Sequence, residues 1–155
     1  MAAVRKRGND IWYTVTSRVG FSRKDRPACP NAVDDVLLVQ YMLNKFVTRH
    51  NDSILPGGKL AVDGVIGTKT LYALLMFQSS MVGGRNVETA VWEGDEWGCV
   101  DPVSQDLPGA RVLRTLMYNL YYFSLPREIR GNLTDQPDCP ALLRQVLQSK
   151  APLAS

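Results

Sequence analysis

The chain has 155 residues, of which 45% are hydrophobic, so it can bury a packed core as one domain or as one small module with additions. This composition excludes disorder over most of the chain, while a net charge of +3 by itself indicates no particular partner. No stretch approaches the roughly 18–20 apolar residues of a membrane span, so we expect none.

The N-terminal segment is basic. Residues 1–26 contain seven Arg or Lys residues and two Asp residues, so they could bind an anionic surface such as nucleic acid or lipid headgroups, or form a solvated and partly mobile terminus. Gly8, Asn9 and Asp10 follow the first basic cluster, so no secretory signal is recognisable. Residues 11–16 are rich in β-branched and aromatic types and predict one short strand or an extended arm.

The next segment predicts two helices joined by a turn-rich loop. Apolar residues recur at three- and four-residue steps over about residues 32–49, and two acidic residues suit the positive end of this helix. Residues 50–58 are rich in turn-forming types, and residues 59–62 can form a very short extended piece. A second helix is predicted over about residues 68–81, with Leu71, Leu74, Leu75 and Gln78 on one face, and the glycine pair at residues 83–84 should end it.

The second half of the chain is less regular. Residues 83–108 predict a long loop that could include one short strand or hairpin. A third helix is predicted over about residues 109–123. A short final helix from Pro140 to about Gln148 should bury Leu142, Leu143, Val146 and Leu147. We therefore expect a mainly α-helical fold, with a three-helix core, short extended segments and an extra C-terminal helix packed on the outside.

These elements suggest three parts of the chain. We expect a basic arm with a short strand over residues 1–30 and a helical domain over residues 31–125, with an irregular insertion at residues 79–108. Residues 126–155 would form a C-terminal extension.

Residues 63–70 (DGVIGTKT) combine a tight turn with the start of the second helix. Asp63-Gly64 is a turn dipeptide in which glycine can take positive φ, and Gly67 would let the backbone pass closely. Ile66 can enter the core between the helices. Thr68 can cap the second helix by accepting a backbone N–H.

Two glutamines lie at positions that are otherwise typical of the core. Gln40 is in the first predicted helix, and Gln78 is in the second, beside Phe77, which we expect to pack back on the first helix. A buried side-chain amide must find partners, so we predict that both glutamines hydrogen-bond loop backbone.

The order of these residues resembles the signature of the peptidoglycan-binding family, a small helical module that binds cell walls. The family shows an Asp-Gly turn, an aliphatic or aromatic residue, a glycine, a threonine and, further along the helix, a Phe-Gln pair. Its preceding helix carries Val-x-x-Leu-Gln-x-x-Leu, which here is Val36, Val39 in place of the leucine, Gln40 and Leu43.

The resemblance covers residues 31–78, with a degenerate second half to about residue 123. In that half, residues 99–101 (CVD) parallel residues 61–63 (AVD). The resemblance implies a peptidoglycan-binding-like helical core and noncatalytic recognition of peptidoglycan, without a metal or cofactor.

A shallow groove beside residues 63–72 would then contact the peptide stem or the glycan, through backbone groups and side chains. The candidate ligand-binding residues on this reading are Asp63, Gly64, Thr68, Lys69, Tyr72, Trp92 and Trp97. The protein would act at the cell wall or periplasm, or within a secreted or virion assembly, after synthesis in the cytoplasm.

A second hypothesis makes the chain a structural or adaptor subunit of a machine that crosses the cell wall. A phage tail, a contractile injection system or a type VI secretion apparatus would be such a machine, and the module would contact protein, or wall and protein both. The absence of a recognisable signal and the additional terminal segments favour this hypothesis.

A third hypothesis is a wall hydrolase that uses the acidic residues between Trp92 and Trp97, namely Glu93, Asp95 and Glu96. The alternatives are sugar or partner binding, or a solvated loop whose tryptophans cover the core. We expect no enzyme, because the single histidine, His50, has no second histidine or paired cysteine with which to hold zinc. Nucleic-acid binding would depend on the basic N-terminus alone.

The remaining candidates are cysteines and aromatic residues. The three cysteines are an odd number with wide spacing, so one pair could be bridged in an oxidising compartment, or all could be free. Cys29 and Cys139 each neighbour a proline in loop-like sequence and should be accessible. Two aromatic groups more often pack than bind ligand: Trp12 and Tyr13 near the N-terminus, and Tyr118, Tyr121 and Tyr122 on the third predicted helix.

Overall fold

The structure, a computed structural model, describes residues 2–7, 10–22, 24, 28–49, 58–83, 98–102 and 133–149. This part of the chain is mainly α-helical, as predicted, with helices α1 (Val33–Arg49), α2 (Thr68–Gly83) and α4 (Ala141–Gln148). The predicted third helix at residues 109–123 lies outside it, as do His50, Trp92, Trp97 and the acidic residues between the two tryptophans. None of the helices described is long and apolar enough to cross a membrane.

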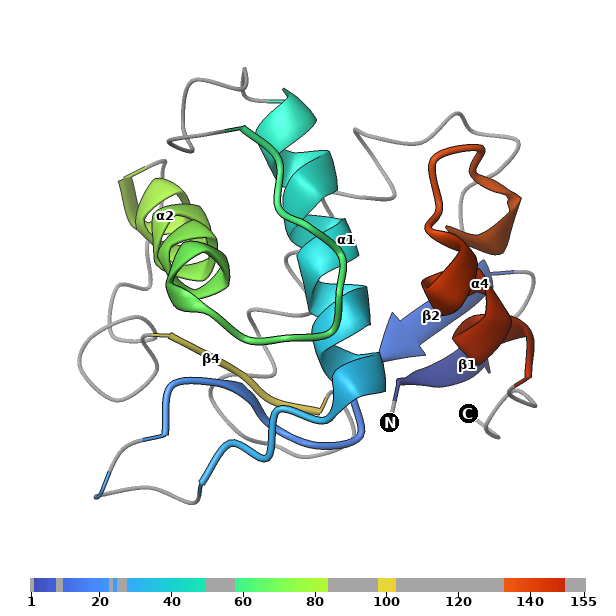
Figure 1. The fold of residues 1–155 in the computed structure, drawn as a ribbon, viewed down its shortest axis with the longest axis horizontal. Coiled ribbons are helices and arrows are strands. Elements are labelled where there is room, and N and C mark those ends of the chain that lie inside the picture. Colours follow the sequence, from blue (N-terminus) through green and yellow to red (C-terminus); the bar gives the residue numbers. More distant parts are fainter. Residues whose placement is uncertain are drawn as a thin grey trace.

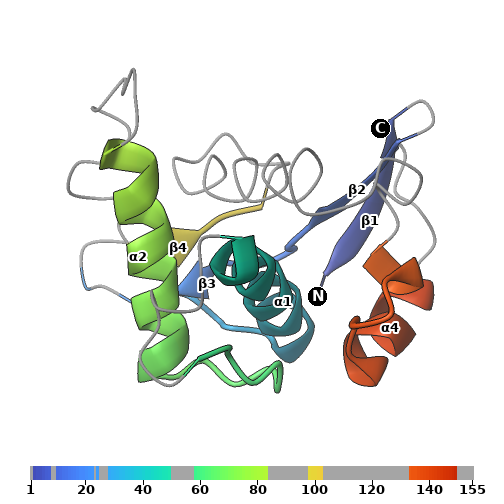
Figure 2. The same cartoon turned by 90° about the horizontal axis from the view of Figure 1, so that it is seen from above.

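Helix α1 is the centre of the fold. It lies between α2 on one side and α4 with a β-hairpin on the other, in both views of the ribbon (Figures 1 and 2). Every residue from Asp35 to Leu43 is buried, so the helix is covered on all sides over this length. The apolar spacing predicted this helix over residues 32–49, and the prediction is confirmed.

The β-hairpin consists of β1 (Ala3–Arg7) and β2 (Asp10–Thr14), which pair antiparallel from Ala3 opposite Thr14 to Arg7 opposite Asp10. The sequence predicted only the second strand, over residues 11–16. It missed β1, because three consecutive basic residues have low strand propensity and only pairing with β2 supplies their backbone partners.

A second antiparallel pair joins two distant parts of the chain. Strand β3 (Val19–Gly20) pairs with β4 (Cys99–Val100), with Val19 opposite Val100 and Gly20 opposite Cys99. The N–H of Phe21 also donates to the carbonyl of Gly98 at 2.8 Å. Within residues 83–108, for which a loop with one short strand or a hairpin was expected, the described part thus contains the short strand β4.

Helices α2 and α4 each bury one face. The predicted face of α2 was Leu71, Leu74, Leu75 and Gln78, but the buried residues are Thr70, Ala73, Leu74, Phe77 and Gln78. The face is thus rotated toward Phe77, while the other two leucines are only half-buried.

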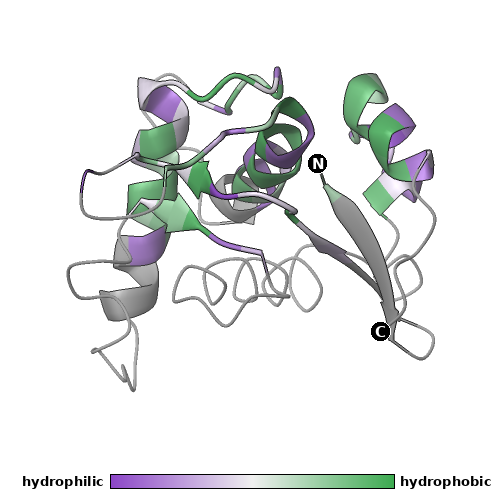
Figure 3. Ribbon diagram, turned by 90° about the horizontal axis from the view of Figure 1, so that it is seen from below, coloured by the Kyte–Doolittle hydropathy of each residue, from purple (hydrophilic) through white to green (hydrophobic). Residues whose placement is uncertain are grey.

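Hydrophobic and hydrophilic residues are interspersed along α4 (Figure 3). Leu143 and Leu147 enter the core, Val146 is half-buried and Leu142 is 49% exposed, so the expectation that all four would be buried was wrong for Leu142. A short 3₁₀ helix, η5 (Leu133–Asp135), precedes α4.

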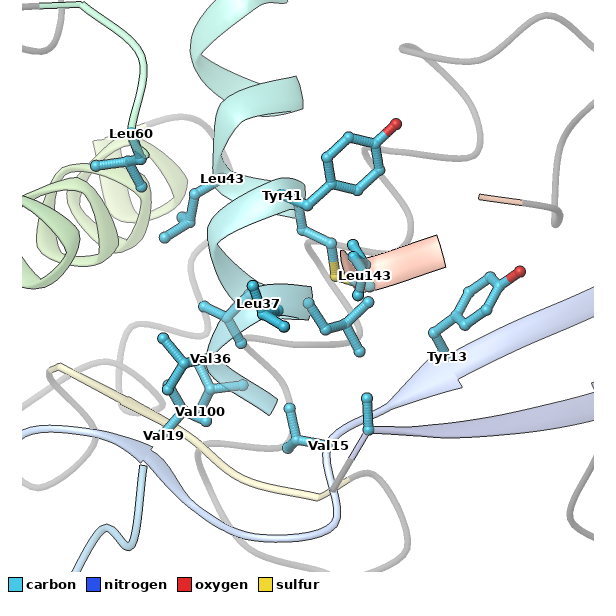
Figure 4. Packing of buried hydrophobic residues seen from close by; sticks show 14 of the residues in the cluster. Tyr13, Val15, Val19, Val36, Leu37, Tyr41, Leu43, Leu60, Val100 and Leu143 are labelled. Atoms are coloured by element: carbon cyan, nitrogen blue, oxygen red, sulfur yellow. The ribbon is translucent and has the colours of Figure 1, made fainter. Parts of the chain in front are cut away.

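One buried cluster connects the hairpin end, the β3–β4 pair, the three helices described and η5. Figure 4 shows Tyr13 and Val15 beside Leu37 and Tyr41 of α1 and Leu143 of α4. The cluster also includes the core residues of α2 and Leu133 of η5. The three segments that the sequence suggested thus contribute to the same core.

Candidate functional site

Two side-chain amides one turn apart on α1 hold the segment before α2. The amide of Asn44 accepts a hydrogen bond from the N–H of Leu60 at 2.8 Å and donates one to the carbonyl of Leu60 at 2.9 Å. These two hydrogen bonds replace the backbone hydrogen bonds that a neighbouring strand would provide to Leu60. The short extended piece expected at residues 59–62 is accordingly not part of a strand.

Gln40 is the second amide, and it is buried. Its Oε1 accepts from the N–H groups of Asp63 (3.1 Å) and Gly64 (3.0 Å). Its Nε2 donates to the carbonyl of Val65 at 3.0 Å and to the hydroxyl of Thr70 at 3.1 Å. The prediction that Gln40 binds loop backbone is confirmed. Gln78 follows the same rule, because its Oε1 accepts from the N–H of Gly98 at 2.7 Å.

The turn itself requires its glycine. Gly64 has φ 76°, and a Cβ there would lie 2.6 Å from Cγ1 of Val33. The carboxylate of Asp63 accepts from the N–H of Val65 at 2.9 Å and from the side-chain amide of Gln40 at 3.1 Å, and these two hydrogen bonds lower the pKa of Asp63.

Two expectations about the start of α2 were wrong. The carbonyl of Gly67 accepts the first helical bond, from the N–H of Leu71 at 3.0 Å, so Gly67 and not Thr68 stands at the capping position. A Cβ on Gly67 would meet no described atom within 4 Å, so this glycine is not required for a close approach. Ile66 is half-buried against the core, as expected.

The anchored turn is followed by a run of exposed side chains. Val65 is 64% exposed and Tyr72 is 42% exposed, and Thr68 and Lys69 are exposed between them. On the other side of Gly64, Val33 is 55% exposed. Nζ of Lys69 donates to the carbonyl of Lys59 at 3.1 Å, which holds this ammonium beside the preceding loop.

The structure therefore brings together the predicted ligand residues that it describes, which are Asp63, Gly64, Thr68, Lys69 and Tyr72. Gly64 differs from the others because it is buried. The backbone N–H groups of residues 63–65 all donate within the protein, so contacts in this turn would come from side chains and not from these N–H groups.

A second polar cluster joins β3 to β4. Nε of Arg18 donates to the buried carboxylate of Asp101 at 2.6 Å, and Nη2 of Arg18 lies 3.3 Å from the sulfur of Cys99. No local pattern in the sequence predicts this pair, because 83 residues separate Arg18 from Asp101. Asp101 is thus a buried ion-pair partner, unlike the exposed turn residue Asp63 that it parallels in the sequence.

All three cysteines are free thiols and all are buried. Cys29 is 7% exposed and Cys139 is 5% exposed, so the expectation that both would be accessible was wrong. The sulfur of Cys29 donates to the carbonyl of Phe21 at 3.1 Å and lies 3.7 Å from the sulfur of Cys99. In the part of the chain that the structure describes, no group of three or more His, Cys, Asp or Glu residues could hold a metal ion.

Two tyrosines connect the C-terminal part to the rest of the core. The hydroxyl of Tyr13 accepts from the N–H of Leu133 at 3.1 Å, and burial raises the pKa of Tyr13 to about 12. The hydroxyl of Tyr41 donates to Asp138 at 2.9 Å, and Lys45 pairs with the same carboxylate. Burial and this hydrogen bond raise the pKa of Tyr41. The core role expected for Tyr13 is confirmed.

Comparisons with known proteins add no assignment. No protein-family model matches the chain, and neither a curated protein nor a solved structure matches it.

Proposed function

We propose that the protein binds peptidoglycan without catalysing a reaction, through the side chains that follow the turn at residues 63–65. The anchoring of this turn by Gln40 is the observation that carries the proposal. One buried amide fixes two N–H groups, one carbonyl and the hydroxyl of Thr70, so it sets the position of the turn relative to both α1 and α2. The resemblance to the peptidoglycan-binding family supplies the ligand class.

Fixed geometry favours binding, because a loop that is already ordered loses little conformational entropy when the ligand arrives. Thr68 and Tyr72 are four residues apart on α2, so they lie on the same side of the helix. The ring of Tyr72 offers an apolar face and a polar edge to a sugar or to a peptide stem. The ammonium of Lys69 suits the carboxylates of a peptide stem.

Co-sedimentation with purified sacculi tests the proposal. We expect the full-length protein to sediment with sacculi more than an unrelated basic protein of similar charge. Tyr72→Ala should weaken the affinity by about tenfold, the loss that corresponds to one well-placed contact. Lys69→Ala should weaken it less, because an exposed charge contributes less than a ring in contact.

Matched controls lie elsewhere on the surface. Leu142→Ala removes another exposed apolar side chain, and Lys24→Ala removes another exposed lysine. Neither should change sedimentation. The proposal would be contradicted if the wild-type protein were not enriched over the basic control, or if Leu142→Ala reduced sedimentation as much as Tyr72→Ala.

A second candidate function is that of a structural or adaptor subunit in a wall-crossing machine. Two exposed apolar side chains beside the same turn favour this function. Val33 and Val65 flank Gly64, and both side chains are more than half exposed. Exposed apolar groups of this kind are typical of the centres of protein interfaces.

Val33→Asp distinguishes the two functions. An acidic residue suits the first turn of α1, so the helix should persist. An adaptor should lose co-purification with sheath, spike or tail proteins, while sedimentation with sacculi should persist if the wall is bound through Tyr72. A monomeric protein that binds sacculi and co-purifies with none of these proteins would contradict the adaptor function.

A further inference from the structure

The thiols of Cys29 and Cys99 are neighbours in the folded protein, although 70 residues separate them in the sequence. Both side chains are buried, and their sulfur atoms lie 3.7 Å apart. We infer that these two cysteines form a disulfide when the protein is in an oxidising environment. The bond would tie the segment before α1 to β4.

Hydrogen bonds fix the backbone on both sides of this pair. The pairing of β3 with β4 places Gly20 opposite Cys99. The backbone hydrogen bond from the N–H of Phe21 to the carbonyl of Gly98 extends this pairing by one residue on each strand. The N–H of Cys29 donates to the hydroxyl of Ser22 at 3.1 Å. The sulfur atoms must approach by only about 1.7 Å to reach the S–S bond length of about 2.05 Å, which small side-chain rotations can supply.

Formation of the bond requires an oxidant, and a small-molecule disulfide or a dithiol–disulfide oxidoreductase is suitable. The thiolate of Cys29 attacks one sulfur of the oxidant, forms a mixed disulfide and releases the other sulfur as a thiol. The thiolate of Cys99 then attacks the sulfur of Cys29 and releases the second thiol of the oxidant. The protein loses two protons and two electrons, and the oxidant gains them.

The surroundings of the two sulfurs set this order. Cys29 is 7% exposed and Cys99 only 1%, and the neighbours Ala28 and Pro30 are exposed, so an oxidant reaches Cys29 before Cys99. Cys99 lies deeper, and its hydrogen bond with Cys29 and its burial raise its pKa, which makes it a poor first nucleophile. The guanidinium of Arg18, 3.3 Å from the sulfur of Cys99, stabilises the thiolate needed for the second step.

Cys139 does not belong to this pair. Its sulfur donates to the carbonyl of Pro140 at 3.8 Å, beside α4, whereas the proposed disulfide joins the segment before α1 to β4. It should remain a thiol after oxidation, and it provides the matched control variant.

The test uses the full-length protein treated with oxidised glutathione, under native conditions and in denaturant. We expect the native protein to lose about 2 Da relative to the reduced protein, and a non-reducing peptide map to show Cys29 joined to Cys99. The melting temperature should rise by about 10 °C in the wild type and in Cys139→Ser. Cys99→Ser should show no rise and should retain glutathione on Cys29.

Three results would overturn the inference. The first is a native protein whose Cys29 and Cys99 both remain alkylatable after oxidation, or retain glutathione without forming a bond. The second is a peptide map in which Cys139 is a partner. The third is a Cys29–Cys99 bond that forms in denaturant but not in the native protein. The mass and the peptide map of the wild type decide the pairing even if a variant fails to fold.

Discussion

The side-chain amide of Gln40 donates a hydrogen bond to the hydroxyl of Thr70, 3.1 Å away, across the contact between α1 and α2. The same amide nitrogen donates to Val65, and the amide oxygen accepts from Gly64. One side chain therefore connects a helix pair to the turn that precedes the second helix. The positions of the exposed residues after the turn depend on it.

Gln40→Ala should lower the free energy of unfolding by about 3 kcal/mol, because it leaves several buried polar groups without their partner. Urea denaturation measures the loss. Gln145→Ala, at an exposed position of α4, is the matched control and should change stability by less than about 0.5 kcal/mol. Equal effects of the two substitutions would show that Gln40 does not anchor the turn.

Gly64→Ala should destabilise the protein by about 2 kcal/mol, because alanine would be strained at this positive φ and its Cβ would clash with Val33. Gly67→Ala, three residues later, meets no described atom within 4 Å, so it should cost only about 1 kcal/mol, because alanine is a poorer N-cap than glycine. Adding Val33→Ala should recover the steric part of the Gly64→Ala loss. Thermal melts of the three variants check this, and a neutral Gly64→Ala would contradict the geometry of the turn.

Arg18→Met should lower stability by about 3 kcal/mol, because it leaves the buried carboxylate of Asp101 without its charge partner. Asp101→Asn in the same background should recover part of the loss, since it removes the buried negative charge that Arg18 pairs with. A double-mutant cycle measured by urea denaturation gives the coupling. Additive losses would mean that the pair is not coupled.

Tyr13→Phe should cost about 1–2 kcal/mol near neutral pH, because the buried N–H of Leu133 loses its acceptor. The pKa of Tyr13 is raised from 10.0 to about 12 in the folded protein. Its stabilising contribution is therefore complete below pH 10 and is lost as the pH rises toward 12, where the unfolded chain ionises first.

The stability difference between wild type and Tyr13→Phe should shrink over that pH range. Tyr41 also has a raised pKa, but it is present in both proteins, so the difference isolates Tyr13. Urea denaturation at several pH values measures it. A difference that stays constant above pH 10 would contradict the burial of the Tyr13 hydroxyl.

Local patterns predicted well the helices that the structure describes. The apolar spacing in α1, the glycine pair that begins at the last residue of α2 and the leucines of α4 are local signals, and α1, α2 and α4 begin and end close to the predicted residues. The roles of Gln40 and Gln78 were also predictable, because an amide at a core position must bind polar groups.

Long-range pairing was not predictable in this way. Nothing near Arg18 indicates Asp101, and nothing near Cys29 indicates Cys99, since β3 and β4 are two residues each and meet only in the folded chain. The expectation that Cys29 is accessible was wrong for the same reason. Proline-rich neighbours suggested an exposed loop, while the partner that buries the thiol comes from beyond α2.

The candidate site was predictable as a segment but not in detail. The turn and the exposed side chains on α2 follow from the sequence, whereas the engagement of the turn N–H groups by Gln40 and Asp63 required the packing of the turn on α1. The burial of Gly64 behind Val33 likewise depends on that packing.

Titration of the isotopically labelled protein with soluble peptidoglycan fragments, followed by backbone amide chemical shifts, tests the central proposal most directly. We predict saturable shifts centred on Val65, Lys69 and Tyr72, and a loss of these shifts in Tyr72→Ala but not in Leu142→Ala. Saturable shifts centred on another surface, or no shifts at millimolar fragment concentrations, would contradict peptidoglycan binding at this site.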